Sequence, residues 1–171
     1  MDRVQAGALD ELSVLFERYQ VRIYNFLLRQ CRDREMALDL SQSVFERVIK
    51  YRQSYNPAHT FKSWIYQIAR NLFKDHLRKQ AVKFSDYTDM DQVEGSDMGG
   101  YAKAVEREMK EGLYEAMDLL PPERKELLVL SKFQGMKYEE ISEITGMTVA
   151  AIKVNVHRAM KQLREVYFAT S

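Results

Sequence analysis

One stretch of the sequence carries basic side chains at helical spacing and no acidic ones. In TVAAIKVNVHRAMKQLR, residues 148–164, four residues are Lys or Arg and none is Asp or Glu. The whole chain of 171 residues is nearly balanced, with 26 basic and 25 acidic side chains. Cations on one face of a helix can bind phosphates and the acceptor atoms of guanine. The stretch therefore predicts a helix that binds DNA.

The residues before this helix complete the pattern of a helix-turn-helix. YEEISEIT predicts a short helix, Gly146 supplies the turn and Thr148 suits the N-cap of the long helix. The side expected to face the core holds Val149, Ile152, Val156, Leu163 and either Ala159 or Met160. The residues expected to contact DNA are Thr148, Ala150, Lys153, Val154, His157, Arg158 and Lys161. Among them Val154 is apolar and suits a thymine methyl group.

A solvated basic helix is the alternative explanation of the same stretch. Basic amphipathic helices are common, and they also suit membrane surfaces and acidic partners. The turn, the N-cap residue and the preceding short helix favour the helix-turn-helix.

A second basic segment lies between residues 61 and 80, with five basic side chains against one acidic residue, Asp75. Cations beside aromatic rings suit single-stranded or melting DNA, because phosphates need positive charge and exposed bases need a stacking surface. Trp64 and Phe73 can instead belong to the core. The residues expected to face DNA are Trp64, Arg70, Asn71, Lys74 and Arg78.

The helix before this segment has more apolar surface than one buried stripe requires. A second stripe, spaced four, three and four residues apart, holds Leu38, Gln42, Phe45 and Ile49, with Asp39 at its edge. An exposed apolar stripe indicates a protein partner. Packing of the stripe on the first helix or on the linker is the alternative.

Apolar residues recur at three- and four-residue steps in every ordered segment, which predicts an all-α protein. We expect helices over about 8–30, 37–51, 61–79 and 105–120, then one from 122 to about 134, before the helix-turn-helix. Residues 81–104 lose this periodicity, and residues 81–100 hold one lysine and five acidic residues. We therefore predict two small helical bundles, residues 1–80 and 105–171, joined by a flexible acidic linker over 81–104.

Several classes of protein do not fit the sequence. No apolar run approaches the roughly 18 residues of a membrane span, and the N-terminus lacks the apolar core of a secretion signal, so we expect a cytoplasmic protein with no membrane insertion. Cys31 is the single cysteine, and three scattered histidines complete no metal site, so we expect neither metal nor cofactor. A nucleic-acid hydrolase using Asp39, Asp75 or His76 lacks paired carboxylates that converge with a nucleophile, and we expect no enzyme.

Three segments resemble, in order and spacing, the conserved regions of the bacterial sigma-70 family. They are ALDLSQSVFERVIKY, FKSWIYQIARNLFKDHLRK and LPPERKELLVLSKFQGMKYEEISEITGMTVAAIKVNVHRAMKQLRE. The lack of further domains makes the chain similar to the extracytoplasmic-function (group 4) branch. The resemblance covers nearly everything except the linker and the extreme ends. It implies a promoter-specificity subunit without catalytic residues, which binds core RNA polymerase and directs transcription initiation.

The resemblance also implies roles for particular residues. The family's clamp-binding motif, D-L-x-Q-E-x-F, falls on residues 39–45, with Ser43 where the family usually has Glu. The stripe of Leu38, Gln42, Phe45 and Ile49, with Asp39 at its edge, would then dock on the clamp coiled coil of the largest polymerase subunit. The melting and minus-ten region falls on residues 55–62 and on the helix that follows, and the minus-thirty-five reader falls on the terminal helix. Further implied partners are the flap of the second polymerase subunit, promoter DNA and an anti-sigma factor.

A stand-alone helix-turn-helix regulator with an N-terminal dimerisation or ligand domain is the alternative of another class. Transcription in vitro separates the two, because a sigma factor makes core polymerase start at specific promoters and a repressor cannot.

Overall fold

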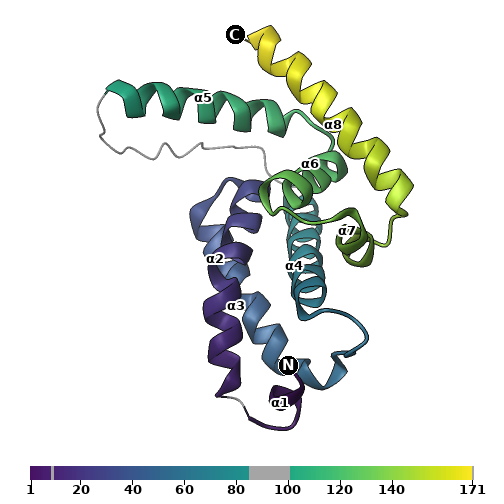
Figure 1. The fold of residues 1–171 in the computed structure, drawn as a ribbon. Coiled ribbons are helices and arrows are strands. Elements are labelled where there is room, and N and C mark those ends of the chain that lie inside the picture. The colour runs from purple at the N-terminus through teal and green to yellow at the C-terminus, as the bar shows by residue number, and fades with distance from the viewer. Residues whose placement is uncertain (9, 85–100, 171) are drawn as a thin grey trace.

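The computed structural model describes residues 1–8, 10–84 and 101–170, and over these ranges it contains helices, turns and loops but no strand (Figure 1). The all-α prediction is confirmed for this part of the chain. The helices in order are α1 (Asp2–Gln5), α2 (Glu11–Cys31), α3 (Arg34–Lys50), the 3₁₀ turn η1 (Arg52–Ser54), α4 (Phe61–Phe84), α5 (Tyr101–Asp118), α6 (Pro122–Leu128), the π-helical turn η2 (Val129–Phe133), α7 (Tyr138–Thr145) and α8 (Val149–Thr170).

The first bundle consists of α2, α3 and α4, which bury their apolar faces against one another. The connection between α2 and α3, residues 32–33, is short. Arg32 ends α2 in a left-handed conformation, with φ 55°, and the Asp33 carboxylate accepts a hydrogen bond of 2.9 Å from the Met36 N–H, which caps α3. Fully buried side chains in the core of the first bundle include Ile23, Phe26, Leu27, Val44, Val48, Ile65 and Tyr66.

The second bundle consists of α5 to α8. Pro122 is the first residue of α6, where the missing N–H breaks no helical hydrogen bond. The single helix expected from 122 to about 134 is divided in the structure, because a π-helical turn, η2, replaces its second half. Fully buried side chains in this core include Met117, Leu127, Leu128, Leu130, Ile141 and Ile152.

The predicted linker lies mostly outside the described residues, which omit 85–100. At its two ends α4 continues to Phe84 and α5 begins at Tyr101, so helices enter the predicted linker range from both sides. None of the helices that the structure describes is long and apolar enough to cross a membrane.

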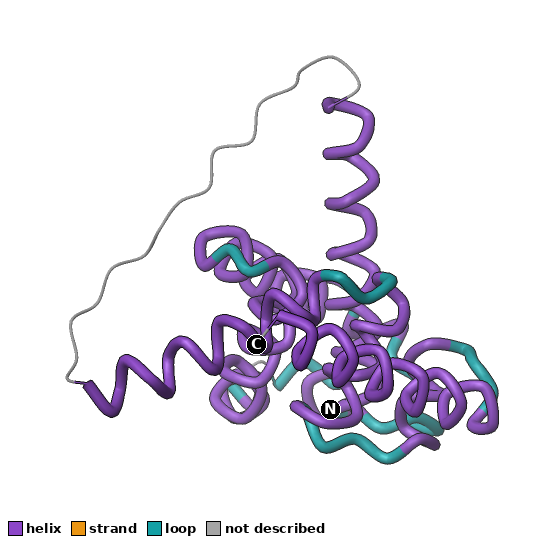
Figure 2. The backbone as a smooth tube through the Cα atoms, turned by 90° about the horizontal axis from the view of Figure 1, so that it is seen from above, coloured by secondary structure: helices purple, strands orange, loops and turns teal. Residues whose placement is uncertain are grey.

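The two bundles contact each other directly. Helix α7 packs beside α4, and η2 packs on α2, so segments far apart in the sequence lie side by side. Figure 1 shows α7 next to α4. Figure 2 shows from a second direction that most helices are gathered together, while the two helices that adjoin the grey trace extend away from the others.

Candidate nucleic-acid and protein interfaces

Helices α7 and α8 form the predicted helix-turn-helix. Gly146 ends α7 in the left-handed conformation, with φ 76°, and its N–H donates to the Ser142 carbonyl at 2.9 Å. The Thr148 hydroxyl then accepts a hydrogen bond of 3.2 Å from the Ala151 N–H, so Thr148 caps α8 as predicted. The Ser142 hydroxyl donates to the Met147 carbonyl at 2.6 Å and holds the turn from the other side.

The two faces of α8 separate as the sequence indicates, with one exception. Ile152, Val156, Ala159 and Leu163 are buried, and Ala159 rather than Met160 occupies the core position. Val149 was expected in the core, but it is 38% exposed, because it is the first residue of the helix and lies at the end of the bundle. The residues predicted to contact DNA are all exposed: Thr148, Ala150, Lys153, Val154, His157, Arg158 and Lys161.

A groove of about 440 Å³ runs along one edge of this face. It brings Lys132 of η2 and Tyr138 of α7 beside Lys153, His157 and Arg158. Sequence reasoning did not single out Lys132 or Tyr138, because helical periodicity does not show which helix lies next to α8. The groove combines cations with an aromatic ring, which suits contacts to a DNA backbone.

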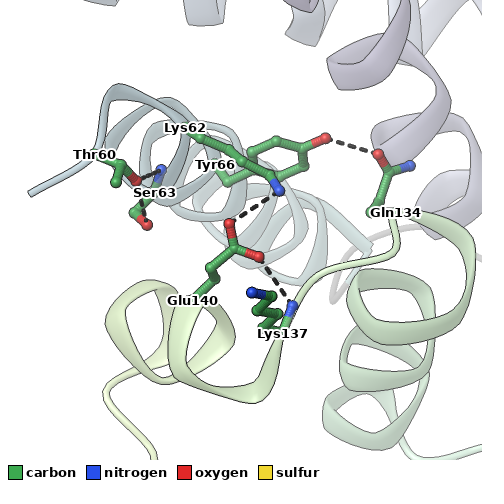
Figure 3. Close-up of polar contacts among 7 residues, drawn as sticks. All are labelled: Thr60, Lys62, Ser63, Tyr66, Gln134, Lys137 and Glu140. Atoms are coloured by element: carbon green, nitrogen blue, oxygen red, sulfur yellow. Dashed lines mark hydrogen bonds and ion pairs between the residues drawn. The ribbon is translucent and has the colours of Figure 1, made fainter.

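The loop before α4 and the start of that helix are held by their own polar groups. The Tyr55 hydroxyl donates to the His59 carbonyl at 2.7 Å, and the Asn56 side chain accepts from the Ala58 N–H at 3.0 Å. The Thr60 hydroxyl accepts from the Ser63 N–H at 3.2 Å and so caps α4 (Figure 3). Residues 56–60 are exposed, so the loop that directly precedes α4 is hydrogen-bonded and open to solvent.

Trp64 belongs to an aromatic cluster at the start of α4. Its ring centroid lies 5.2 Å from that of Tyr55 and 6.0 Å from that of Phe61, and Phe61 packs edge-to-face on Tyr19. Trp64 is half-buried. The alternative that Trp64 and Phe73 are core residues therefore holds in part, because both pack against the first bundle's core.

The basic residues of α4 have different surroundings. Asn71, Lys74 and Arg78 are exposed along the helix. Arg70 was predicted on the same free face, but its side chain is only 15% exposed and its Nε lies 2.7 Å from Oε1 of Glu126 in α6. Arg70 therefore differs from the exposed cations of α4, because its guanidinium is paired with a carboxylate of the second bundle.

Further polar contacts join α4 to the second bundle (Figure 3). Lys62 Nζ lies 3.1 Å from Glu140 Oε1, and the Tyr66 hydroxyl donates to Gln134 Oε1 at 2.7 Å. Burial raises the pKa of Tyr66, which therefore stays protonated as the donor. Burial opposes the charge of Glu140, but hydrogen bonds from the Lys137 N–H and from Lys62 outweigh it and lower the pKa of Glu140 below its usual value.

A second groove, of about 770 Å³, lies between α2 and α3 and contains the predicted apolar stripe. Leu38 and Ile49 are exposed at its edges, while Phe45 is buried edge-to-face against Phe16 of α2, with 4.8 Å between ring centroids. The stripe thus packs partly on α2, as the alternative reading expected, and leaves an open apolar groove. Asp39 is exposed and does not line this groove. The lining residues from α3 are Leu38, Ser41, Gln42, Phe45, Glu46 and Ile49.

Among the described residues, no three His, Cys, Asp or Glu side chains lie close enough together to hold a metal ion. Asp75, a candidate of the hydrolase alternative, instead forms an ion pair of 3.8 Å with Arg78 on the same helix.

Comparison with protein families divides the chain at the same place as the two bundles. Sigma-70 region 2 matches residues 15–82, and Sigma-70, region 4 matches residues 110–163. The first range contains nearly all of α2 to α4, and the second contains half of α5, all of α6 and α7 and most of α8.

Curated relatives match nearly the full length of the chain. RNA polymerase sigma factor CarQ of Myxococcus xanthus is 32% identical over 166 residues, which cover 97% of this chain and 94% of that protein. The ECF RNA polymerase sigma factor SigM of Bacillus subtilis is 32% identical over 155 residues, which cover 90% of this chain and 93% of that one.

Solved structures show the same fold. The sigma factor RpoE in complex with the anti-sigma factor NepR from Bartonella quintana superposes with a TM-score of 0.75 at 20% identity, covering 91% of this chain and 96% of that one. CnrH in complex with the cytosolic domain of CnrY gives 0.77 at 18% identity, with 99% and 96% covered. With both conserved regions and full-length relatives matched, the chain belongs to the sigma-70 family, as a sigma factor of the extracytoplasmic-function type, a non-catalytic subunit that directs promoter recognition by RNA polymerase.

Proposed function

We propose that this sigma factor divides promoter recognition between its bundles, with α8 reading duplex DNA of the minus-thirty-five element. The observation that carries the proposal is the exposed face of α8, which presents Lys153, Val154, His157 and Arg158 while the opposite face is buried. The N-cap residue Thr148 and Ala150 in the first turn of α8 have small side chains, so the helix can approach base edges closely. Lys161, one turn beyond Arg158 on α8, would contact a phosphate.

The first bundle, residues 1–80, is proposed to melt and capture the minus-ten element. Exposed Asn71, Lys74 and Arg78 would hold the backbone of the unpaired strand, and the aromatic cluster around Trp64 stands where the ordered loop meets α4. Base stacking on aromatic rings, together with phosphate neutralisation, is the usual way to bind a single strand. Arg70 joins this surface only after its pair with Glu126 opens.

The groove between α2 and α3 is proposed as the docking site for the clamp coiled coil of the largest polymerase subunit. Its apolar edges, Leu38 and Ile49, fit the apolar face of a partner helix, and Gln42 adds a polar contact between them. Asp39, which is exposed just outside the groove, would add a charged contact at the rim.

Docking on polymerase would supply selectivity that neither bundle has alone. Each cationic surface is small and by itself should hold DNA weakly and in a salt-dependent way. Once the protein is tethered to polymerase, the second bundle, residues 105–171, meets its DNA element at high effective concentration, so the two weak sites act together.

Two further partners follow from the same assignment. The flap of the second polymerase subunit would position the second bundle, and an anti-sigma factor would hold the free protein inactive. Two structurally similar proteins, RpoE and CnrH, were solved in complex, RpoE with an anti-sigma factor and CnrH with the cytosolic domain of CnrY. All of these contacts would take place in the cytoplasm.

The docking groove is tested with a pair of matched leucine variants. Leu38 at the groove is 61% exposed, and Leu119, which directly follows α5, is 64% exposed. Leu38→Asp and Leu119→Asp therefore place the same charge at similarly open positions. We expect Leu38→Asp to weaken binding to core polymerase by about tenfold or more, because it puts a carboxylate into an apolar contact. Leu119→Asp should bind like the unmodified protein.

Fluorescence titration of labelled protein with core polymerase measures both affinities. Equal binding by the two variants would show that the docking site lies elsewhere. Failure of the unmodified protein to bind core polymerase would remove the assignment and favour the stand-alone regulator.

A further inference from the structure

The short helix α1 lies against the turn that leads into the exposed loop of the first bundle. It contacts both α2 and the 3₁₀ turn η1, which joins α3 to that loop (Figure 1). Val4 is only 1% exposed, so α1 is packed on the bundle. Gly7 follows with a φ of 101°, a conformation that favours glycine, and its N–H donates to the Val4 carbonyl at 3.2 Å.

The Gln5 side chain joins α1 to both ends of η1. Its Nε2 donates to the Arg52 carbonyl at 2.9 Å and to the Tyr55 carbonyl at 2.8 Å. From η1, Gln53 Nε2 donates to the Gln5 carbonyl at 2.8 Å. A glutamine amide has two N–H donors, so one side chain can bind both carbonyl oxygens. Three hydrogen bonds therefore hold η1 to a helix that lies 47 residues earlier in the chain.

Tyr55 connects this contact to the loop over residues 56–60. Its carbonyl is bound by Gln5, its side chain is only 8% exposed, and its hydroxyl donates to the His59 carbonyl at 2.7 Å. The Tyr55 ring centroid lies 5.2 Å from that of Trp64 in the aromatic cluster at the start of α4. A shift of Tyr55 would therefore move both the loop and the ring on which Trp64 packs.

We propose that Gln5 is a positioning residue for the capture of the melted strand, because it fixes, through Tyr55, the shape of the loop over residues 56–60. This inference rests on the proposed function for the role of the first bundle in that capture. A loop already held in its binding shape loses little conformational entropy when it binds. If the loop kept this shape in about a tenth of the molecules, the affinity for a base that it captures would fall about tenfold.

The variant Gln5→Met tests the contact, because methionine is similar in length to glutamine and has no N–H donor. Its control is Ala6→Met, which places the same side chain at the neighbouring exposed position. A second variant, Gln53→Met, removes the third hydrogen bond from the side of η1. All three leave Val4 in place, and circular dichroism establishes that each full-length variant is folded.

Hydrogen–deuterium exchange of the free protein measures the loop directly. Within the loop the Ala58 N–H donates to Asn56 Oδ1 and the His59 N–H donates to the Asn56 carbonyl, both at 3.0 Å. We expect peptides that cover residues 52–60 to exchange about tenfold faster in Gln5→Met than in Ala6→Met, with a smaller increase in Gln53→Met. Peptides from the buried parts of α3 and α4 should exchange alike in all the variants.

The base preference of the reconstituted holoenzyme measures the consequence for DNA. The probe is a promoter that the unmodified holoenzyme selects from random DNA, with a non-complementary template strand that keeps the minus-ten segment unpaired. Each of the four bases is placed in turn at each unpaired position. We expect Gln5→Met to lower the preference for the best base about tenfold relative to Ala6→Met, because only that base uses the loop.

Binding to core polymerase and to the upstream duplex should be the same for Gln5→Met and Ala6→Met. A uniform loss of binding to all the probes, with the preference unchanged, would show that Gln5 only stabilises the fold and would overturn the inference.

The remaining outcomes separate this inference from the proposed function. If Gln5→Met matches Ala6→Met in both exchange and base preference, Gln5 does not position the loop, and the proposed function is untouched. Faster exchange with an unchanged preference also contradicts the inference, because the shape of the loop then does not decide which base is captured. If the unmodified holoenzyme has no preference within the unpaired segment, the proposed minus-ten capture itself fails.

Discussion

At the scale of residues, side chains of one type have different tasks because their neighbours differ. Arg158 and Lys153 stand exposed on α8, whereas Arg70 is held by Glu126 and Lys62 by Glu140. Residue type and helical position could be read from the sequence, and they placed all the predicted DNA-reading side chains of α8 on an exposed face. The partners of Arg70 could not, because they depend on which helix packs against α4.

Arg158 gives the residue-scale prediction. If its guanidinium contacts guanine, Arg158→Ala should cost about 1 to 3 kcal/mol of promoter binding and relax the preference at one base pair. The affinity of polymerase carrying the variant is measured on promoters that differ at single positions of the upstream element.

Arg164→Ala, an exposed arginine further along the same helix, is the control and should keep the preference at every position. A uniform loss of affinity across all the promoters would make Arg158 a phosphate contact instead.

At the scale of elements, local chemistry decides where helices start and stop, and much of it could be predicted. Gly146 and Thr148 end α7 and cap α8 as their residue types indicate. Val149 was misplaced, because the helical pattern does not show that the first turn of α8 extends beyond the core. Phe45 was placed on a free stripe, but Phe16 of α2 covers it, and such packing between helices is not encoded in the spacing of either one.

The N-cap of α8 gives the element-scale prediction. Thr148→Ala removes the acceptor for the Ala151 N–H and should lower the free energy of unfolding by about 1 kcal/mol. Thr148→Ser keeps the hydroxyl and should lie close to the unmodified protein. Urea unfolding followed by circular dichroism measures both, and equal destabilisation by Ala and Ser would show that the hydroxyl does not stabilise the helix start.

At the scale of the whole molecule, the sequence predicted two bundles but not how they meet. Periodicity identifies the apolar faces that build each core. The polar contacts between the bundles, made by groups such as Arg70, Glu126 and Gln67, have no periodic signature. Arg70, which looks free in the sequence, is therefore paired with the second bundle in the structure.

The central claim is that two separate cationic surfaces choose promoters once the protein is docked on polymerase. The most direct measurement is selection of random DNA by reconstituted holoenzyme, followed by sequencing of the bound fragments and mapping of the transcript starts. The account predicts two short elements at a fixed separation, both absent when core polymerase is used alone. Fragments no more selective than those of core polymerase, or a single palindromic site bound without polymerase, would contradict it.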